Sequence, residues 1–342
     1  MNVPPPLAIS TGDPGGVGPE VALRAVASAA RDDRVVLFGD ASSLRERAAI
    51  CGIAIERLRT IEPGAEGDLP PGSVGLIDVG TPWSAAACRH AATAEGGAAQ
   101  LAALDGAITA ALAGRVRALV TAPMSKAAVN LTGQEFTGHT EHLARAAGLP
   151  DDSVTMMFLG PRLRVALATT HVAVADLPRE VTAARVQRAI EHLADALLRL
   201  DARAGMAERV LRLAVTGLNP HAGEGGLFGD EEPRAIAPAI AAAAARPPFS
   251  SGRVQLQGPL GAETALRLAA SGDVDGVVAM THDQATIASK LLDWTLAVNV
   301  TWGLPFVRTS VDHGVAYDAA ERGSADPAGM VSALAMAQQL TR

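Results

Sequence analysis

The chain has 342 residues, of which 29 are Lys or Arg and 36 are Asp or Glu, giving a formal charge of −7 at pH 7. This length suits one large domain or two ordinary domains. The acidic balance argues against the basic surface that nucleic acid binding needs, so we expect no nucleic acid partner. A small anionic ligand would require a local cluster of Lys and Arg side chains.

The sequence has none of the marks of a secreted or membrane protein. The opening residues, MNVPPPLAIS, have neither a basic n-region nor an apolar h-region. The most apolar run, at 235–245, is too short and too rich in Ala to span a bilayer. Cys51 and Cys88 cannot form a disulfide framework and are expected to be structural. We therefore expect a cytoplasmic protein with no membrane partner.

Strand-like and helical runs alternate in the first part of the chain. Helical runs are expected at 19–30, from about 40, at 98–113 and at 124–131, and each follows a short apolar run at 7–10, 35–38, 74–79 and 118–121. Pro19 suits the first position of its helix. This alternation predicts an α/β sheet with parallel strands and helical crossovers.

The middle of the chain predicts some antiparallel pairing. Only Gly160, Pro161 and Arg162 separate the apolar runs at 154–159 and 163–169, which favours a hairpin. Further elements are then expected as helices at 181–200, 233–245 and 262–270, and as strands at 210–216, 254–257 and 276–280. The predicted sheet is therefore mixed.

A glycine-rich turn, GDPGGVG at 12–18, follows the first strand and precedes the first helix. Its spacing matches neither the dinucleotide fingerprint nor the P-loop. Glycines that allow a tight turn and glycines that contact a ligand remain equal alternatives here.

Three histidines, His171, His221 and His282, each follow an apolar strand. Three imidazoles at one rim of a sheet could bind a divalent ion and leave positions open for a substrate. Their wide separation matches no local metal signature, so structural histidines are the alternative. We interpret His90 and His192, which lie in helical runs among charged residues, as surface side chains.

Several polar residues could form an anion pocket. Lys290, Asn299 and Arg308 follow the last histidine, and Thr140 in the run GHT could open a helix whose N–H groups face an anion. Lys126 is a further candidate. The alternative is that the Lys and Arg residues are surface charges and Thr140 a helix cap.

The motifs that carry a resemblance occur in one order over nearly the whole chain. They are STGDPGGVGPE (10–20), TAPMSK (121–126), FTGHTEHLA (136–144), TTHV (169–172), GLNPHAGEGGLFG (217–229), GPL (258–260), HDQ (282–284), NVTWGLP (299–305), RTSVDHG (308–314) and GSADP (323–327). Together they resemble the 4-hydroxythreonine-4-phosphate dehydrogenase family of pyridoxal phosphate biosynthesis, a branch of the isocitrate/isopropylmalate dehydrogenase group.

The resemblance implies a two-lobed isocitrate/isopropylmalate dehydrogenase-like α/β fold with mixed sheets and a cleft between the lobes. Residues 1–135 and 298–342 would form the cofactor-side lobe. Residues 136–297 would form the lobe for substrate, metal and dimerisation. No linker rich in Ser or Pro divides the chain, so the lobes are expected to exchange strands.

The resemblance also implies the site residues. The metal ligands would be His171, His221 and His282, with the third ligand coming from the partner subunit of an obligate homodimer whose active sites lie at the interface. Zn²⁺, Mg²⁺ or Co²⁺ would act as a Lewis acid. Substrate would contact His139, Thr140, Lys290, Asn299 and Arg308. The implied catalytic residues are His282, Asp283 and Lys290, with Asp283 orienting an imidazole or, alternatively, capping a turn.

NAD is the expected cofactor, with NADP as the alternative. The run DHGVAYDAAERGSADP at 312–327 is similar to the adenosine-binding loop of the wider group, so the cofactor would contact Gly12, Asp13, His313, Gly314 and Asp318. A carboxylate at Asp318 would accept a hydrogen bond from the ribose 2′-hydroxyl and repel a 2′-phosphate. Asp326 is expected to cap the helix that follows Pro327.

The implied reaction is oxidation and decarboxylation of 4-phosphooxy-L-threonine to 3-amino-2-oxopropyl phosphate. The chain departs from the family pattern at Thr281, Ala285, 286–289, Trp302, His142 and the pair Glu321 and Arg322. Relatives act on D-threonate or D-erythronate 4-phosphate or on carboxylated cis-dihydrodiols, so these substrates are the first alternative. A catalytically silent ligand-binding homologue is the second.

Overall fold

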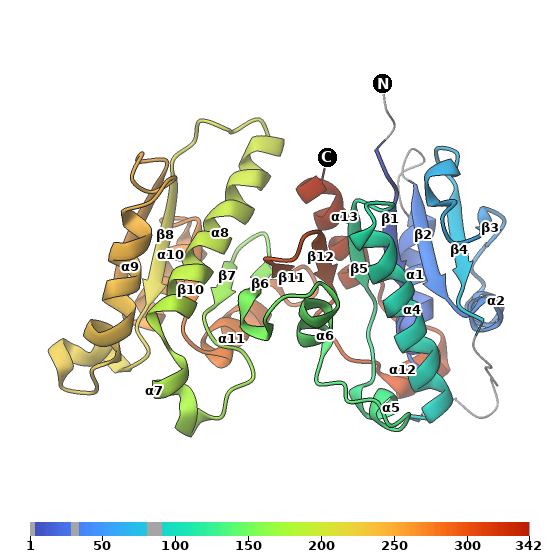
Figure 1. The fold of residues 1–342 in the computed structure, drawn as a ribbon, viewed down its shortest axis with the longest axis horizontal. Helices are drawn as coiled ribbons and strands as arrows, with labels where there is room; N and C mark the ends of the chain where they lie inside the picture. The colour runs from blue at the N-terminus through green and yellow to red at the C-terminus, as the bar shows by residue number, and fades with distance from the viewer. Residues whose placement is uncertain (1–3, 29–33, 81–90, 342) are drawn as a thin grey trace. The chain divides into compact units, whose positions relative to one another are not determined.

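The computed structural model describes residues 4–28, 34–80 and 91–341 (Figure 1). Cys88 and His90 lie outside these residues, and Cys51 is a free thiol. The chain divides into two compact units, which we describe separately. Unit 1 comprises Met1–Asp151 and Leu304–Thr341, and unit 2 comprises Asp152–Gly303.

The strands of unit 1 form a parallel sheet. In spatial order they are β3 (Leu58–Thr60), β4 (Val74–Asp78), β2 (Val35–Gly39), β1 (Leu7–Ser10), β5 (Ala118–Thr121) and β12 (Val307–Ser310). Each pairs with its neighbour in parallel register, as the alternation of strands and helices predicts. The strand at the centre, β1, is wholly buried because both of its faces are covered.

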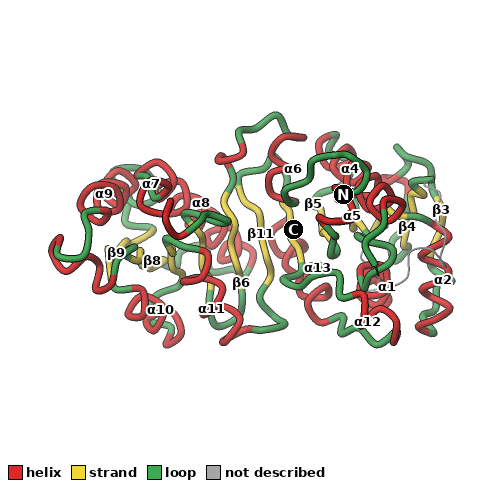
Figure 2. The backbone as a smooth tube through the Cα atoms, turned by 90° about the horizontal axis from the view of Figure 1, so that it is seen from below, coloured by secondary structure: helices red, strands yellow, loops and turns green. Residues whose placement is uncertain are grey.

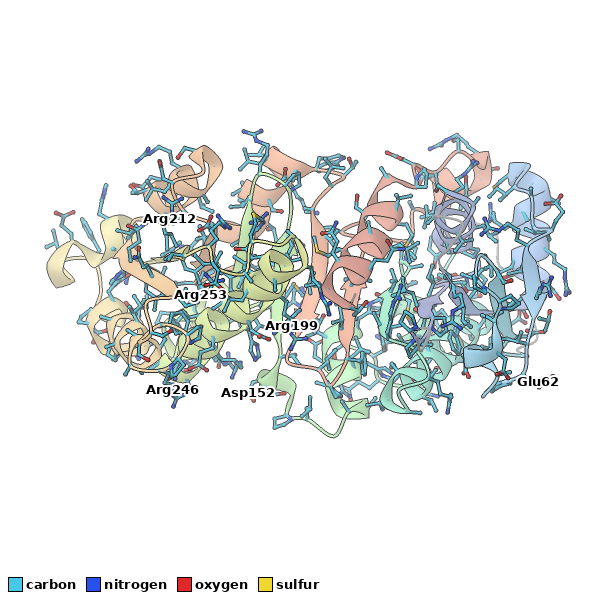
Figure 3. The ribbon with its side chains drawn as sticks, turned by 90° about the horizontal axis from the view of Figure 1, so that it is seen from above. Glu62, Asp152, Arg199, Arg212, Arg246 and Arg253 are labelled. Atoms are coloured by element: carbon cyan, nitrogen blue, oxygen red, sulfur yellow. The ribbon has the colours of Figure 1, made fainter. Side chains whose placement is uncertain are left out.

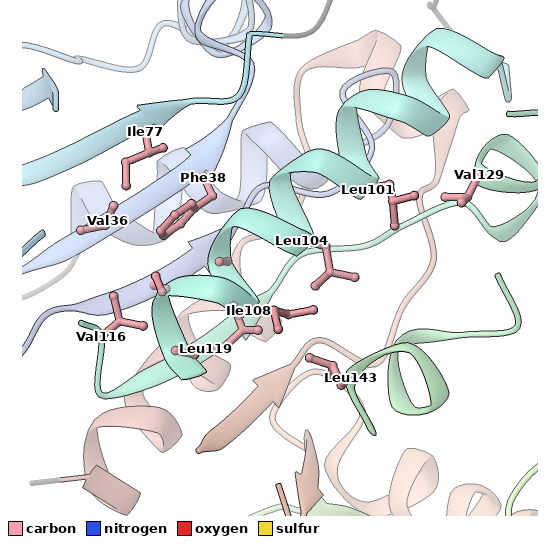
Figure 4. Close-up of a cluster of buried hydrophobic side chains, with 14 of the residues drawn as sticks. Val36, Phe38, Ile77, Leu101, Leu104, Ile108, Val116, Leu119, Val129 and Leu143 are labelled. Carbon is pink, nitrogen blue, oxygen red and sulfur yellow. The ribbon is translucent and has the colours of Figure 1, made fainter. Parts of the chain in front are cut away.

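Helices cover both faces of this sheet. Helix α4 (Ala94–Leu112) packs on β1 and β2, where Leu104 and Ile108 meet Phe38 and Leu119 in one apolar cluster (Figure 4). Helix α13 (Ala328–Thr341) packs on β5 and β12. The remaining helices of the unit are α1 (Gly18–Ser28), α2 (Ala41–Cys51), α5 (Lys126–Asn130), α6 (His139–Ala146), α12 (Tyr317–Arg322) and the short turn η1 (Glu66–Asp68). The short turn η2 (Asp151–Ser153) spans the chain boundary between the units.

The strands of unit 2 form a mixed sheet. In spatial order they are β11 (Val298–Trp302), β6 (Thr155–Leu159), β7 (Arg164–Leu167), β10 (Gly276–Ala279), β8 (Leu211–Thr216) and β9 (Val254–Leu260). The β6–β7 pair is antiparallel, which confirms the predicted hairpin, and β11 also pairs with β6 in antiparallel register. The pairs from β7 to β9 are parallel. The mixed sheet expected from the sequence is therefore confirmed.

Helices also flank the sheet of unit 2 (Figure 2). They are α7 (Leu177–Glu180), α8 (Ala183–Arg203), α9 (Ala237–Ala244), α10 (Ala262–Ser271), α11 (His282–Asp293) and the short segments η3 (Val174–Asp176), η4 (Pro220–Gly226) and η5 (Glu232–Ile236). Phe158, Val165 and Val277 contribute to the apolar core on the side of α10 and α11. No helix in the described part of the chain is long and apolar enough to cross a membrane.

The two units meet in the sequence at 151/152 and 303/304, whereas the lobe boundaries were expected at 135/136 and 297/298. Helix α6 belongs to unit 1, because Leu143 packs into the same cluster as Leu104. Strand β11 belongs to unit 2, where it pairs with β6 along five residues. The roles expected for the two lobes stay a prediction.

The prediction that His192 is a surface residue is wrong. Its ring is half-buried on α8 and its Nδ1 lies 2.8 Å from the Thr155 hydroxyl. Burial, reinforced by the positive charge of Arg188, lowers the pKa of His192 to about 4. Polar residues in helices are usually exposed, which favoured a surface position. The contact of His192 with Thr155 on β6 arises only in the tertiary fold.

Arg199 and Arg246 are surface arginines of unit 2 (Figure 3) and both form ion pairs. Arg246 contacts Glu191 at 3.1 Å, and Arg199 contacts Asp195 at 3.3 Å. Arg199 also lies over the ring of Trp302, whose indole N–H donates to Asp195 at 3.0 Å. The unusual Trp302 therefore has a structural role, because it packs β11 against α8.

Candidate active site

His282 is fixed at the carboxyl end of β10 by a capping box. It is the first residue of α11, and the Thr281 hydroxyl accepts a hydrogen bond from the Gln284 N–H at 3.3 Å. The Gln284 side chain accepts in turn from the backbone N–H groups of Met280 and Thr281, at 2.9 and 3.2 Å. These reciprocal bonds satisfy the free donors of the first helical turn and fix the path into the helix.

His171 lies beside His282. It follows β7, which pairs with β10 in parallel, so both histidines lie at the carboxyl edge of one sheet. The Thr169 hydroxyl donates to the Met280 carbonyl at 2.6 Å and joins the two strand ends. The ring centroids of His171 and His282 are 5.6 Å apart. Of the three histidines expected at one rim of the sheet, His171 and His282 are therefore in contact.

Asp283 contacts His282 directly. Its Oδ1 lies 2.8 Å from His282 Nδ1, so a ring that donates from Nδ1 has Nε2 available as a ligand. Carboxylate–imidazole pairs of this kind orient histidines that bind metals. The contact does not require a bound ion, and its role in catalysis stays a prediction.

His221 follows β8, the neighbour of β10 on its other side. It begins a run of five residues, His221 to Gly225, whose φ angles lie between 44° and 79°. For each residue with a Cβ this left-handed conformation costs about 1–2 kcal/mol. Its side chain is exposed. In the described part of the chain, no three His, Cys, Asp or Glu side chains are grouped so as to hold a metal ion.

The residues present fit a divalent ion in their donor chemistry. Imidazole nitrogens suit zinc and cobalt, whereas magnesium favours oxygen ligands. The pair His171 and His282 supplies two such nitrogens within ring contact of each other. Among the three metals that the resemblance implies, the donor set therefore favours Zn²⁺ or Co²⁺.

Arg308 is a buried cation in unit 1. It lies on β12 and is only 2% exposed. Its Nε and Nη2 donate to the Thr121 hydroxyl on β5, at 3.2 and 2.6 Å. Burial lowers the pKa of Arg308 to about 9, and the negative charge of Glu141 opposes this. With that pKa the side chain is still cationic at neutral pH.

His139 opens α6 near this guanidinium. Its Nε2 is buried and has no hydrogen-bond partner within the described chain. Burial, together with the positive charges of Arg308, His142 and Lys126, holds the pKa of His139 well below its usual value. A neutral imidazole with an unsatisfied nitrogen beside a buried cation can receive a polar, anionic ligand. Thr140, the next residue, is half-buried.

The other expected anion-binding residues belong to unit 2. Lys290 lies on α11, and its Nζ is 5.9 Å from the centre of the Trp294 ring. Asn299 lies on β11, and its Oδ1 is buried without a hydrogen-bond partner in the described chain. Lys290 and Asn299 thus lie in unit 2 and Arg308, His139 and Thr140 in unit 1, and the anion pocket stays a prediction.

The glycine-rich turn and the loop after β12 meet within unit 1. The Val17 N–H donates to the Val315 carbonyl at 2.9 Å. Gly12 has a φ of 70°, and a Cβ there would lie 2.2 Å from the Pro123 carbonyl oxygen. Close backbone approach is thus sufficient to explain Gly12, while a cofactor contact stays a prediction.

Asp13 is buried at the centre of this turn. It accepts hydrogen bonds from the Tyr317 hydroxyl at 2.7 Å, the Gly15 N–H at 2.9 Å and the Gln100 amide at 3.4 Å. Burial raises the pKa of Asp13, and the three donors oppose that effect. The carboxylate therefore fastens the turn to α12.

The residues expected to contact adenosine are accessible. His313, Gly314 and Asp318 are exposed, and the Asp318 carboxylate has Arg322 at 4.0 Å. An exposed carboxylate in the first turn of α12 fits a ribose, so this part of the chain is compatible with a nicotinamide dinucleotide. The Asp326 side chain accepts from the Ala328 N–H at 2.9 Å, which confirms the predicted cap.

Four residues that shape these sites were not assigned a role from the sequence. Thr121 accepts from Arg308, Tyr317 donates to Asp13, Gln284 caps α11, and Glu232 is hydrogen-bonded to the loop before His221. The capping box was readable, since Thr281 and Gln284 have the required spacing. The other contacts join residues distant in sequence.

Parallel strands flanked by helices, with polar residues at their carboxyl ends, define the class as an α/β enzyme. The chain belongs to the family described as pyridoxal phosphate biosynthetic protein PdxA, whose model matches residues 31–337. This is a family of dehydrogenases, as its named relatives indicate. The resemblance and the mixed α/β fold expected from the sequence are therefore confirmed.

Three known proteins illustrate the similarity. A 4-hydroxythreonine-4-phosphate dehydrogenase of Geobacter metallireducens is 41% identical, covering 100% of this chain and 97% of the relative. A D-threonate 4-phosphate dehydrogenase of Cupriavidus necator is 38% identical, covering 98% and 97%. The crystal structure of 4-hydroxythreonine-4-phosphate dehydrogenase from Klebsiella pneumoniae is 35% identical, with a TM-score of 0.81 over 99% of this chain and 100% of that one.

Proposed function

We propose that the chain catalyses the NAD-dependent oxidation and decarboxylation of 4-phosphooxy-L-threonine to 3-amino-2-oxopropyl phosphate. Loss of the C3 hydrogen as hydride to NAD⁺ and of the hydroxyl proton yields a 3-oxo acid. Its carboxylate then leaves as CO₂, the bonding electrons form an enolate, and a proton added at C2 gives the product. Relatives named for this substrate align along the full chain. The observation that carries the proposal is the buried cation Arg308 beside the unsatisfied nitrogen of His139.

These two residues suit a phosphorylated acid. A phosphate monoester carries nearly two negative charges and is bound best by cations and fixed donors. Arg308 supplies a cation already removed from water, so it can bind an anion without a further desolvation cost to the protein. Thr140, Lys290 and Asn299 keep the substrate-binding roles that the resemblance implies.

A divalent ion would be held by His171, His221 and His282. When bound, it would polarise the substrate hydroxyl and stabilise the negative charge that develops on that oxygen. Asp283 would orient the His282 ring, and Lys290 would carry protons to and from the substrate. That His282 is the ligand contributed by the second subunit stays a prediction.

A homodimer is part of this proposal. Ile287, Leu291 and Trp294 recur at helical spacing along α11 and just after it, with 59%, 80% and 71% of their surface exposed. Apolar side chains clustered at the surface mark interaction sites. Since the same helix starts at His282, a subunit docked there would lie next to the expected metal ligands.

The cytoplasmic location and the preference for NAD also stay predictions.

The experiment is to follow NADH formation with 4-phosphooxy-L-threonine, with and without added Zn²⁺ or Co²⁺. We expect turnover that chelation abolishes and metal restores. Arg308→Ala should raise KM strongly, while Arg246→Ala, which removes a surface ion pair with Glu191, should not. Absence of NADH with every candidate substrate and metal would favour the catalytically silent homologue.

The second candidate keeps the reaction and changes the substrate to D-threonate 4-phosphate. The similarity to the Cupriavidus necator enzyme along 98% of this chain favours it. Comparing kcat/KM for the amino acid phosphate and the hydroxy acid phosphates separates the two. Activity on a non-phosphorylated cis-dihydrodiol alone would overturn both.

A further inference from the structure

The turn that carries His221 needs an external support. Five successive residues, 221–225, have left-handed φ angles, and three of them, His221, Ala222 and Glu224, have side chains that disfavour this conformation. Such strain persists only where neighbouring groups determine the backbone path. The question is which group provides that support.

Glu232 is buried at the base of this turn, with only 3% of its surface exposed. Its Oε1 accepts hydrogen bonds from the backbone N–H groups of Leu218 and Asn219, at 2.9 and 2.8 Å. Its Oε2 accepts from the Asn219 side chain at 3.0 Å. One carboxylate thus binds three donors just before the left-handed run begins.

The backbone also closes around this carboxylate. A Cβ at Gly217 would lie 2.8 Å from Glu232 Oε1, and a Cβ at Gly223 would lie 2.7 Å from Oε2. These glycines bracket His221 in the sequence. Burial alone would raise the pKa of Glu232, but the donors of Asn219 and Leu218 outweigh it and lower the pKa, so the group is ionised at neutral pH.

The same loop is tied to the helix that carries His282. Gln284 donates to the Gly217 carbonyl at 3.1 Å and lies 3.3 Å from the Thr216 hydroxyl at the end of β8. The start of the His221 loop therefore has a fixed position relative to α11. What remains to be fixed is the path from Gly217 to His221, and the Glu232 contacts lie along that path.

We propose that Glu232 is a positioning residue, whose carboxylate holds the left-handed turn and so presents the His221 imidazole to the divalent ion. This inference rests on the proposed function, in which His221 is a metal ligand. Glu232 itself does not touch the ion. Its effect is on the conformation of residues 218–225 in the free protein.

The test uses Glu232→Gln in the full-length protein. The amide is similar in shape but presents an N–H₂ group where one carboxylate oxygen now accepts. We expect the affinity for Zn²⁺ or Co²⁺, measured by calorimetry, to fall about tenfold or more, the range for residues that orient metal ligands. Amide hydrogen exchange at 218–228 should accelerate in the metal-free protein.

Rescue by glycine separates positioning from general stability. Glycine adopts the left-handed conformation without a Cβ penalty. Adding Ala222→Gly to Glu232→Gln should therefore restore most of the metal affinity and slow the exchange again. Should Glu232→Gln fail to fold, Glu232→Asp keeps the charge on a shorter side chain, and we expect a smaller loss of affinity that Ala222→Gly again reverses.

Two controls define the outcome. Asp201→Asn removes another buried carboxylate of unit 2, paired with Arg209 at 3.0 Å, and should lower stability without changing metal affinity. His221→Ala tests the ligand itself. If His221→Ala binds metal as the wild type does, the proposed metal site fails. If His221→Ala loses affinity while Glu232→Gln or Glu232→Asp keeps it, the positioning role alone is wrong.

Discussion

At the scale of single residues, the site in unit 1 depends on how a guanidinium is kept in place inside a sheet. Arg308 donates twice to one hydroxyl, that of Thr121, which in turn donates to Ser310 at 2.9 Å. The hydroxyl orients the cation and satisfies part of its hydrogen-bonding capacity. The Thr121 hydroxyl is neutral, so this contact, unlike one with a carboxylate, does not compensate the positive charge of the guanidinium.

Thr121→Val tests this arrangement. The isosteric methyl removes the acceptor for two donors of a buried charge, which costs about 1–3 kcal/mol of stability. Because the guanidinium is less well oriented, KM for the phosphorylated substrate should rise about tenfold, which corresponds to about 1.4 kcal/mol. Steady-state kinetics and chemical unfolding measure both effects.

Thr309→Val is the matched control. Thr309 is buried on the same strand and donates to the Ala333 carbonyl at 2.9 Å, so its loss should lower stability but leave KM unchanged. Equal KM changes in both variants would contradict the role assigned to Thr121.

At the scale of elements, most helices and strands could be predicted because their signals are local. The β6–β7 hairpin followed from a three-residue connection, and α2 begins just after Asp40, whose side chain accepts from the Ser43 N–H as a cap. The left-handed turn at His221 could not be predicted, because its contacts with Glu232 and the close packing of Gly217 and Gly223 come from the tertiary fold. His192 was misplaced for the same reason, since its partner Thr155 lies on a distant strand.

The half-buried His192 on α8 should make the free energy of unfolding depend on pH. The folded pKa, about 4, lies below the ordinary value of 6.5, so between these values the unfolded chain binds a proton that the folded chain does not. The free energy of unfolding should therefore decrease as pH falls from 6.5 to 4, by at most about 3 kcal/mol from this group. Above pH 6.5 this residue should contribute no slope.

Unfolding by denaturant at several pH values measures this effect. His192→Gln, which cannot take up the proton, should flatten the slope between pH 6.5 and 4. An unchanged slope in His192→Gln would show that other groups cause the pH dependence.

At the scale of the whole molecule, the proposed homodimer would have α11 at its interface. This helix combines His282, Asp283 and Lys290 with an exposed apolar row at Ile287, Leu291 and Trp294. The sequence predicted the dimer only through family resemblance, since exposure cannot be read from an amphipathic pattern alone. The three histidines were candidates from their positions after strands, and the resemblance favoured metal binding over a structural role. The contact of His171 with His282 follows from the pairing of β7 with β10.

Leu291→Asp should convert the dimer to monomers, because a charge would be buried at the centre of the proposed interface. Light scattering coupled to size-exclusion chromatography measures the mass directly. Ile50→Asp introduces the same charge at a partly exposed position on α2 in unit 1 and should leave the dimer intact. A wild-type mass for Leu291→Asp, or a monomeric wild type, would contradict the proposed interface.

The division of unit 1 into two chain segments has a consequence for synthesis. Residues 152–303 of unit 2 form one continuous segment, whereas unit 1 also needs β12 and α13, which are translated afterwards. On the ribosome, all residues of unit 2 are therefore synthesised before unit 1 is complete. Until residues 304–341 have emerged, the nascent chain carries β5 with one edge unpaired and without the cover of α13.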